Sequence, residues 1–307
     1  MSKYFDSQNL TFMSPEVKEN GRHMVLTNVH KESKTKYLNI DTRFQNDYSI
    51  NEYAEFNSAL PQTLTNVKSM KVTNVEIPLS FYNFSHKRKN TFLLLESENY
   101  DPINIIIDEG NPDIVDILSQ INSVSMSNLS LTLTDNNKIR MSNNGGYKIK
   151  IFFNVDMIDA VTQELREDNN NLKSKLGWQL GFREPFYELN ANTHIFSESI
   201  PLAFTFSYFY LSIDDFSQTK PESFIVPSSN HYINSNTIAR ISIDPTSYEF
   251  GYPFMANISG GRLLSDTRTY GGKTDIQRLK IKLLDEFGKT VDLNKMDFSF
   301  VLEVVHE

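Results

Sequence analysis

The sequence predicts an all-β fold, a sandwich or barrel of about ten strands with two short helices and an extended N-terminal arm. Three observations support this class. Apolar and polar residues alternate with a period of two from residue 37 to the C-terminus, turn-forming residues separate the alternating runs, and helical periodicity is scarce. No internal repeat and no strand–helix–strand rhythm is present, so a parallel α/β fold is not expected.

The alternating runs predict strands with one face on a core and the other in solvent. Leu129, Leu131 and Leu133 alternate with polar residues, and Phe298 to Val304 do so at the C-terminus. The remaining alternating runs cover residues 37–41, 147–151, 240–243 and 279–283. We therefore expect antiparallel strands over most of the chain from residue 37 onward.

Turn residues predict where the chain reverses. Residues 135–137 (Asp-Asn-Asn) and 143–146 (Asn-Asn-Gly-Gly) tolerate positive φ, so strands at 129–134, 138–142 and 147–153 are expected to form a meander. Residues 285–288 (Asp-Glu-Phe-Gly) are expected to join strands 279–284 and 289–293 in the same way.

The strand expected at residues 67–78 contains a change of parity. Met70 and Val72 occupy even positions whereas Val75 and Ile77 occupy odd ones, so the apolar face would move to the other side of the sheet. A bulge or bend at residues 73–74 would keep one buried face. Pro78 would end the strand, because proline cannot donate a hydrogen bond to a ladder.

Two helices are expected. Asn111 and Pro112 supply an N-cap and a first-turn proline before an amphipathic pattern over residues 114–121. The second helix is predicted over residues 156–168, where Ile158, Val161 and Leu165 share one side.

The charge of the 307-residue chain, −8, is unevenly distributed. Residues 1–36 hold six Lys/Arg and four Asp/Glu, which leaves +2, so the remaining residues carry −10. An acidic body repels a phosphate backbone, and direct nucleic-acid binding is therefore not expected. Residues 1–35 are polar and weakly periodic, which predicts either a disordered tail or an arm that orders against a neighbouring subunit.

Several classes of chemistry find no support in the sequence. The chain has no Cys, which excludes disulfides, Cys-ligated metals and a thiol nucleophile and suits a reducing compartment. No apolar run reaches the roughly 18 residues of a membrane span. No HxH, HExxH, GxSxG, P-loop or GxGxxG pattern occurs, so no catalytic, cofactor-binding or metal-binding residue is assigned. The six histidines are scattered at His23, His30, His86, His194, His231 and His306.

Charged and aromatic clusters are interpreted structurally. The acidic pairs at 108–109, 214–215 and 285–286 are neighbours in sequence, so on a strand they point to opposite faces and are expected at strand ends and turns. The cluster His86-Lys87-Arg88-Lys89 is expected in a solvated loop, with contact to an acidic neighbour as the alternative. The aromatic run 204–216 carries large apolar groups on both faces, which is typical of a central strand or of one that meets another chain.

Several strings, in consistent order over residues 37–304, resemble the penton (vertex) capsid proteins of nucleocytoplasmic large DNA viruses. They are LNIDTRF (38–44), LTNVKSMKVTNVEIPLSFYNFS (64–85), LGWQLGFR (176–183), YFYLSIDDF (208–216), TIARISI (237–243) and DIQRLKIKLLDEFGKTVDLNKMDFSFVLEV (275–304). Residues 1–36 and 217–236 carry no such similarity.

The resemblance implies a single jelly roll of two packed antiparallel sheets over residues 36–307, preceded by the arm at 1–35. It implies a structural virion protein without enzymatic activity or cofactor, assembled in the host cytoplasm as a homo-pentamer at each icosahedral vertex. Neighbouring major and minor capsid proteins are the expected partners. The stretches 44–63, 217–236 and 250–274 are expected to be loops that make lateral or outward contacts.

Two alternatives accompany this interpretation. A minor capsid or cement protein between capsomers would share the fold and the virion location. A carbohydrate-binding or hydrolytic jelly roll would instead carry a concave sheet face with exposed aromatics or facing carboxylates.

Overall fold

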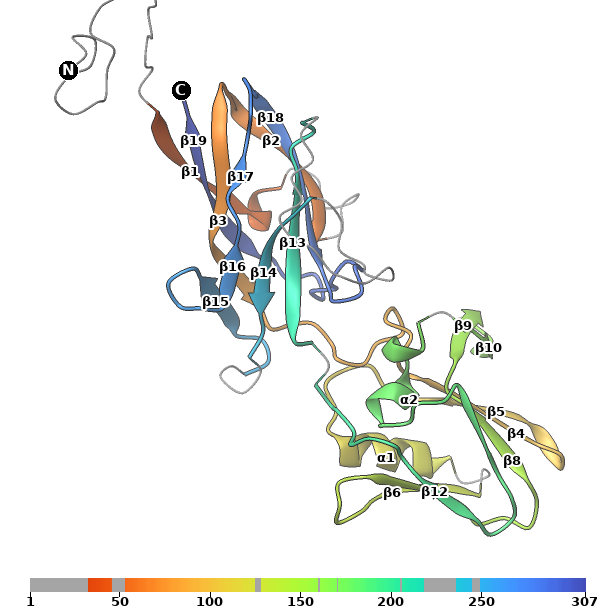
Figure 1. The fold of residues 1–307 in the computed structure, drawn as a ribbon. Coiled ribbons are helices and arrows are strands. Elements are labelled where there is room, and N and C mark those ends of the chain that lie inside the picture. Colours follow the sequence, from red (N-terminus) through yellow and green to blue (C-terminus); the bar gives the residue numbers. More distant parts are fainter. Residues whose placement is uncertain are drawn as a thin grey trace, which may run out of the picture.

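The computed structural model describes residues 33–45, 53–124, 128–159, 161–169, 171–204, 206–217, 236–244 and 249–307. Within these residues every sheet is antiparallel and helix is confined to short segments, so the predicted all-β class is confirmed. Figure 1 shows an elongated sandwich that contains β1 and β19, and a second part that follows β3 and returns to the sandwich at β13.

Eight main strands form the sandwich. In chain order they are β1 (Lys34–Asp41), β2 (Glu55–Leu64), β3 (Val67–Pro78), β13 (Tyr208–Asp214), β14 (Thr237–Ser242), β15 (Pro253–Asn257), β18 (Ile276–Leu284) and β19 (Ser299–His306). One sheet has the order β1-β19-β3-β15, and the other has the order β14-β13-β18-β2. Two short strands complete them: β16 (Leu263–Ser265) pairs with β14, and β17 (Arg268–Thr269) pairs with β3.

The pairing of these strands defines the topology. The first main strand pairs with the eighth, the second with the seventh, the third with the sixth and the fourth with the fifth. The chain therefore runs as one long hairpin whose two arms stay together while they wrap around a common core. Eight strands wound in this way into two sheets of four form a jelly roll, which confirms that prediction.

The alternation seen in the sequence places the core between the two sheets. Phe300, Leu302 and Val304 of β19 are fully buried, and they share one hydrophobic cluster with Leu279 and Ile281 of β18. Each such side chain contributes about 1.5–3 kcal/mol relative to an exposed position. The outward-facing residues of β19 and the outward-facing Lys280 and Lys282 of β18 are at least partly exposed, as a half-buried strand requires.

The predicted irregularity in β3 is a bulge. Val301 of β19 is opposite Asn74, but the next residue, Leu302, is opposite Val72, so Thr73 is the extra residue. Because of this insertion, Val72 and Val75 both face the core and both are fully buried. β3 ends at Pro78, as predicted.

The second part contains two small sheets and a hairpin. Its first sheet, in the order β11-β8-β4-β5, and its second, in the order β12-β7-β6, enclose a separate hydrophobic cluster. The strands are β4 (Phe92–Ser97), β5 (Tyr100–Ile106), β6 (Leu129–Leu133), β7 (Ile139–Asn143), β8 (Ile149–Phe152), β9 (Val155–Asp159), β10 (Glu164–Glu167), β11 (Phe186–Leu189) and β12 (His194–Phe196). The helical segments of the described chain are α1 (Ile114–Ser123), α2 (Leu176–Gln179), η1 (Thr42–Phe44) and η3 (Leu172–Ser174).

The predicted three-strand meander is only half correct. β6 and β7 pair as a hairpin, but β8 leaves them and pairs with β4 and β11 in the other sheet. Turn residues at 143–146 specify a reversal and not a partner, and here the reversal carries the chain from one sheet to the other. The turn at 285–288 forms as predicted, although the stretch after it forms a single bridge, Leu284 to Thr290, and no strand.

The helix expected over residues 156–168 is wrong. This stretch forms the hairpin β9–β10, and the Asp159 side chain accepts hydrogen bonds from the backbone N–H groups of Val161 and Thr162 in the turn. Val161, which the helical pattern placed on a buried side, is 93% exposed. Helical spacing of three apolar residues was coincidental, because a local hydrogen-bonded turn interrupts it.

The other predicted helix is α1, which begins two residues later than expected. Asp113 caps it by accepting a hydrogen bond from the backbone N–H of Asp116 at 2.8 Å. Asn111, the predicted cap, instead accepts a hydrogen bond from the backbone N–H of Asn83.

Two stretches expected to be loops are strands. Residues 44–63 include most of β2, and residues 250–274 include β15, β16 and β17. The third, 217–236, lies almost entirely outside the described residues, as does the arm before residue 33. One unit over residues 36–307 was expected, and the structure divides the core of this range into a sandwich cluster and a cluster of the second part.

Candidate functional site

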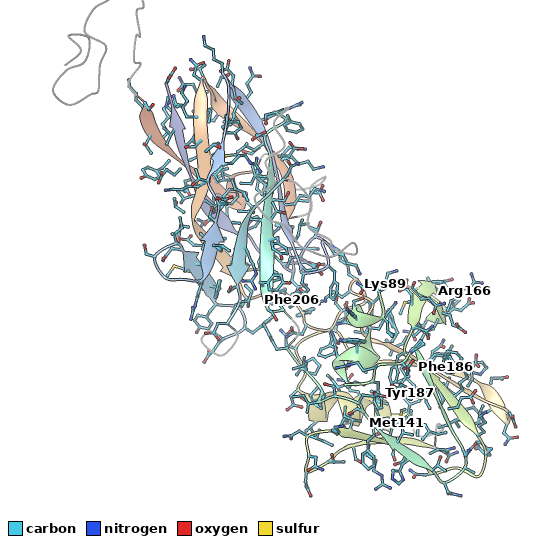
Figure 2. All side chains as sticks on the ribbon, viewed as in Figure 1. Lys89, Met141, Arg166, Phe186, Tyr187 and Phe206 are labelled. Carbon is cyan, nitrogen blue, oxygen red and sulfur yellow. The ribbon has the colours of Figure 1, made fainter. Side chains whose placement is uncertain are left out.

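The basic cluster at residues 86–89 lies in the connection from β3 to β4, where the second part meets the sandwich. Arg88 Nη2 lies 3.7 Å from Glu286 Oε1, and Lys87 Nζ lies 3.6 Å from Asp292 Oδ2. Lys89 pairs with Asp156 within the second part. Figure 2 shows Lys89 on the second part and Phe206 at the adjoining end of the sandwich.

The expectation of a solvated loop is wrong for Arg88. Its side chain is 13% exposed, and its guanidinium carbon lies 3.7 Å from the centre of the Phe206 ring. Phe206 in turn packs edge-on against Phe81, so the two chain segments that connect the parts meet at one aromatic cluster. Arg88 therefore fastens the second part to the sandwich through an aromatic face and an acid.

Burial controls the electrostatics of this junction. It raises the pKa of Glu286 to about 7 and lowers the pKa of Arg88 from its usual range. It also raises the pKa of Asp285, whose side chain accepts hydrogen bonds from the backbone N–H groups of Phe287 and Lys289. The acidic pair 285–286 is thus a turn, as predicted, but a buried one.

A second buried charge lies at the end of β13. Arg268 of β17 donates to Asp215 Oδ2 at 3.0 Å, and Tyr270 donates to the same carboxylate oxygen. Arg268 also donates to the backbone carbonyls of Ile213 and Asn236. Burial alone would raise the pKa of Asp215, but the hydrogen bonds from Tyr270 and Ser217 and the charge of Arg268 outweigh it, so the pKa is lowered.

These contacts give Asp215 a structural role. Residues 213–215 and Asn236 are the two ends of the long connection between β13 and β14, and one guanidinium binds both. The acidic pair 214–215 is at a strand end, as the sequence predicted, but the burial of Asp215 was not foreseen. The remaining acidic pair, 108–109, follows β5, and Glu109 accepts a hydrogen bond from the backbone N–H of His86.

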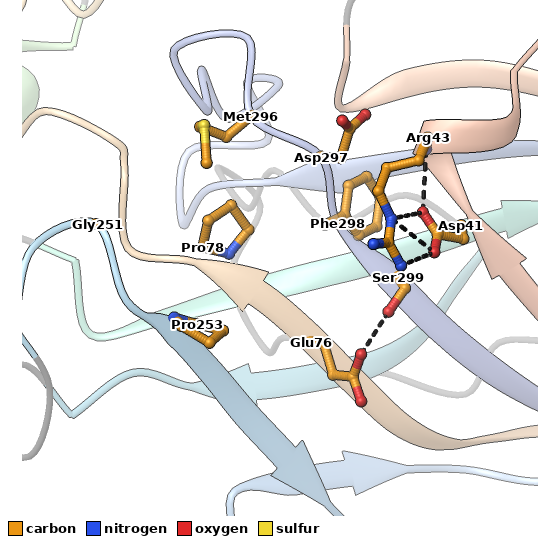
Figure 3. A pocket seen from close by; sticks show the side chains of 10 residues that line it. All are labelled: Asp41, Arg43, Glu76, Pro78, Gly251, Pro253, Met296, Asp297, Phe298 and Ser299. Atoms are coloured by element: carbon orange, nitrogen blue, oxygen red, sulfur yellow. Dashed lines mark hydrogen bonds and ion pairs between the residues drawn. The ribbon is translucent and has the colours of Figure 1, made fainter.

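A surface pocket of about 330 Å³ lies at the end of the first sheet and contains the acidic side chains of Asp41, Glu76 and Asp297 (Figure 3). Each accepts a hydrogen bond: Asp41 from Arg43 Nε at 3.0 Å, Glu76 from Ser299 Oγ at 2.7 Å and Asp297 from Thr42 Oγ1 at 2.7 Å. The hydrogen bond from Arg43 lowers the pKa of Asp41. The hydrogen bonds of Glu76 and Asp297 join segments that are far apart in the sequence, and so they hold the end of the sheet together.

The histidines form no site in the part of the chain that the structure describes. His86 contacts Thr91 Oγ1 and stacks on Phe92, and His194 contacts Arg140 and Phe196. His306 is buried at the end of β19, and His23, His30 and His231 lie outside the described residues. No group of three or more potential metal ligands occurs in the described ranges.

The aromatic run 204–216 contributes the central strand of the second sheet, as predicted. Phe209 and Leu211 face the core, and β13 lies between β14 and β18. On the opposite face Tyr208 and Tyr210 pack edge-on, and the Arg240 guanidinium carbon lies 4.1 Å from the centre of the Tyr208 ring.

Comparisons with known proteins show a resemblance among solved structures. No family model matches the chain, and no curated protein matches it. Among solved structures, the crystal structure of the mavirus penton protein is similar over 88% of this chain and 99% of that one, with 10% sequence identity and a TM-score of 0.40. No helix in the described residues is long and apolar enough to cross a membrane.

Proposed function

We propose that the protein is a structural virion protein, the penton subunit that forms a homo-pentamer at the five-fold vertices of an icosahedral capsid. One observation carries the proposal: the strings that resemble penton proteins include all or part of six of the eight main strands of the jelly roll, in consistent order along the chain.

The coincidence covers six of the eight main strands. The strings at 38–44 and 64–85 contain the second half of β1 and all of β3, and those at 208–216 and 237–243 contain β13 and β14. The last string, 275–304, contains β18 and most of β19. The remaining string, 176–183, contains α2 in the second part.

Different segments of the chain adjoin the two ends of the sandwich. At one end, Lys34 is opposite His306 and the Asn66 backbone N–H binds Asp275, so the arm before β1 and the C-terminus leave from there. The second part is joined at the other end, beside Phe81 and Phe206. In the proposed pentamer, the end with the arm contacts neighbouring capsid proteins and the second part lies at the opposite end.

The alternatives differ in their support. For the hydrolytic jelly roll, the carboxylates of the pocket in Figure 3 each accept a hydrogen bond that contributes to the end of the sheet, and this structural role accounts for their presence there. The minor capsid or cement protein has the same fold and differs only in position on the particle.

Position is therefore the decisive test. A cryo-EM reconstruction of particles that contain the protein should place five copies around each five-fold axis. Density between major capsomers would instead identify a cement protein and contradict the penton assignment. Absence of the chain from purified particles would contradict the capsid role altogether.

A further inference from the structure

On one flank of the jelly roll, each sheet ends in an edge strand, which has a neighbouring strand on one side only. Within the described residues, β1 pairs only with β19 and β2 pairs only with β18. A groove of about 480 Å³ separates the two strands. We call it the edge groove; it is lined by Tyr37, Leu38, Asn39, Ile40, Asp41, Phe44, Gln45, Phe56, Asn57, Ser58, Ala59, Leu60 and Pro61.

The edge groove combines apolar surface with open backbone. Tyr37 and Phe44 are 66% and 79% exposed, and the half-buried Leu38 and Leu60 pack against the sandwich core. The two strands face it over residues 37–41 and 56–61. Five residues of extended chain span about 16 Å, so the groove fits one short strand that adds backbone hydrogen bonds and places every second side chain inside.

Most of the charges that could protect such an edge lie beside the groove; the charged lining residue, Asp41, lies at the end of β1 and is paired with Arg43. Lys34 and Lys36 are on the first half of β1, whereas the groove begins at Tyr37. Charged residues along an exposed edge normally prevent pairing with another chain. The part of β1 that lines the groove thus remains open to an added strand.

The chain itself contains a suitable occupant directly before β1. Residues 24–29 (Met-Val-Leu-Thr-Asn-Val) are mostly apolar, and in an extended conformation they would place the β-branched Val25, Thr27 and Val29 on one face. The four residues that follow, His-Lys-Glu-Ser at 30–33, include no Gly, Pro, Asn or Asp. A two-residue hairpin turn, which favours Gly, Asn or Asp, is therefore disfavoured between this segment and β1, and this favours the groove of another copy over that of the same copy.

We propose that the edge groove of each copy binds residues 24–29 of a second copy as an added strand. The inference rests on the proposed function, because a ring of identical subunits supplies a neighbour for every arm. Such a contact is heterologous: an arm on one copy meets a groove on the next, which is the kind of interface that closes into a ring. It also removes the exposed apolar surface of Tyr37 and Phe44 from water.

Cross-linking between single-cysteine variants tests the proposal cleanly, because the chain has no Cys of its own. Thr27→Cys places a thiol in the arm, and Ser58→Cys places one in the groove at a half-buried position. Mixing the two full-length variants with a short bismaleimide should give a covalent dimer that contains one copy of each. A synthetic peptide of residues 20–32 should abolish this dimer, and a scrambled peptide should not.

The double variant Thr27→Cys/Ser58→Cys distinguishes the two possible sources of the arm. Links between chains support the proposal, whereas a link confined to one chain would show that each arm occupies its own groove and would overturn it. Absence of any link would overturn it as well. As a matched control, Ser130→Cys on β6 of the second part should form no dimer with Thr27→Cys.

Failure of this inference is distinguishable from failure of the proposed function. The cross-linking readout uses purified protein without particles, and the cryo-EM readout locates the chain on the particle. A five-fold position without arm-to-groove links would leave the penton role intact and reject only the contact proposed here.

Discussion

Arg268 is 1% exposed, and its side chain donates hydrogen bonds to residues at both ends of the β13–β14 connection. Arg268→Met removes the charge and leaves the buried Asp215 carboxylate with Tyr270 as its main partner. Breaking one side of a buried pair costs about 3–5 kcal/mol, and we expect a loss of this size in the free energy of unfolding measured with urea.

Two further variants identify the origin of that loss. Arg268→Met/Asp215→Asn should recover part of it, because no uncompensated charge remains buried. Lys148→Met, which removes the exposed ion pair with Glu188, should cost less than about 1 kcal/mol. Equal losses for the exposed and the buried pair would contradict the structural role of Arg268.

Glu286 makes the stability of the protein depend on pH. Because burial raises its pKa from 4.5 to about 7, the folded chain holds this proton more tightly than the unfolded chain does. The stability that protonated Glu286 contributes is complete below about pH 4.5 and is lost as the pH rises to about 7. The difference corresponds to about 3 kcal/mol at most.

Glu286→Gln should flatten this dependence. Urea unfolding between pH 4 and pH 8 should show a smaller decrease in stability for the variant than for the unmodified protein. Some decrease should remain, because burial also raises the pKa of Asp285. Identical slopes for the two proteins would show that Glu286 is not the group responsible.

At the scale of elements, β6 is the edge strand of its sheet, and a side chain of α1 binds its outer backbone. Asn122 of α1 donates to the backbone carbonyl of Leu131 and accepts from its backbone N–H, both at 2.8 Å, as a neighbouring strand would. This contact fixes α1 on the sheet and blocks the edge.

Asn122→Ala should remove both hydrogen bonds, each worth about 0.5–1.5 kcal/mol. We expect lower stability and faster hydrogen exchange of the Leu131 amide. Asn122→Asp keeps the acceptor but not the donor, so its effect should be intermediate. Unchanged exchange at Leu131 in the Ala variant would disprove the edge-blocking role.

At the scale of the whole molecule, the second part enters and leaves the sandwich at one place. The rings of Phe81 and Phe206 are 4.7 Å apart, centre to centre, and the two hydrophobic clusters are separate. A segment with adjacent ends and its own core behaves as an inserted domain. We therefore propose that the sandwich folds without it.

Replacing residues 84–204 with a short Gly/Ser linker should leave a soluble β protein with one cooperative unfolding transition. Circular dichroism and urea unfolding would measure this. The remaining sandwich lacks the contact between Arg88 and Phe206, and its Glu286 is exposed. We therefore expect it to be less stable than the sandwich in the full chain. An aggregated or unfolded product would show that the two parts form one folding unit.

Much of the sandwich could be predicted because the information is local. A strand with one buried face shows a period of two whatever its partner, so β3, β18 and β19 were recognised from alternation, and the shift in parity revealed the bulge at Thr73. Local turn and helix patterns were less decisive. They predicted α1 correctly, but they missed the β9–β10 hairpin and the departure of β8 from the meander.

The sequence by itself determined the all-β class, the buried faces of β3, β18 and β19, the turn at 285–288 and the absence of a recognisable catalytic motif. Only the tertiary structure decided which charges are buried. Arg88 meets Glu286, and Arg268 meets Asp215, across long separations in the chain. Such contacts depend on where the sheets bring distant segments together, and the pattern of neighbouring residues carries no information about that distance.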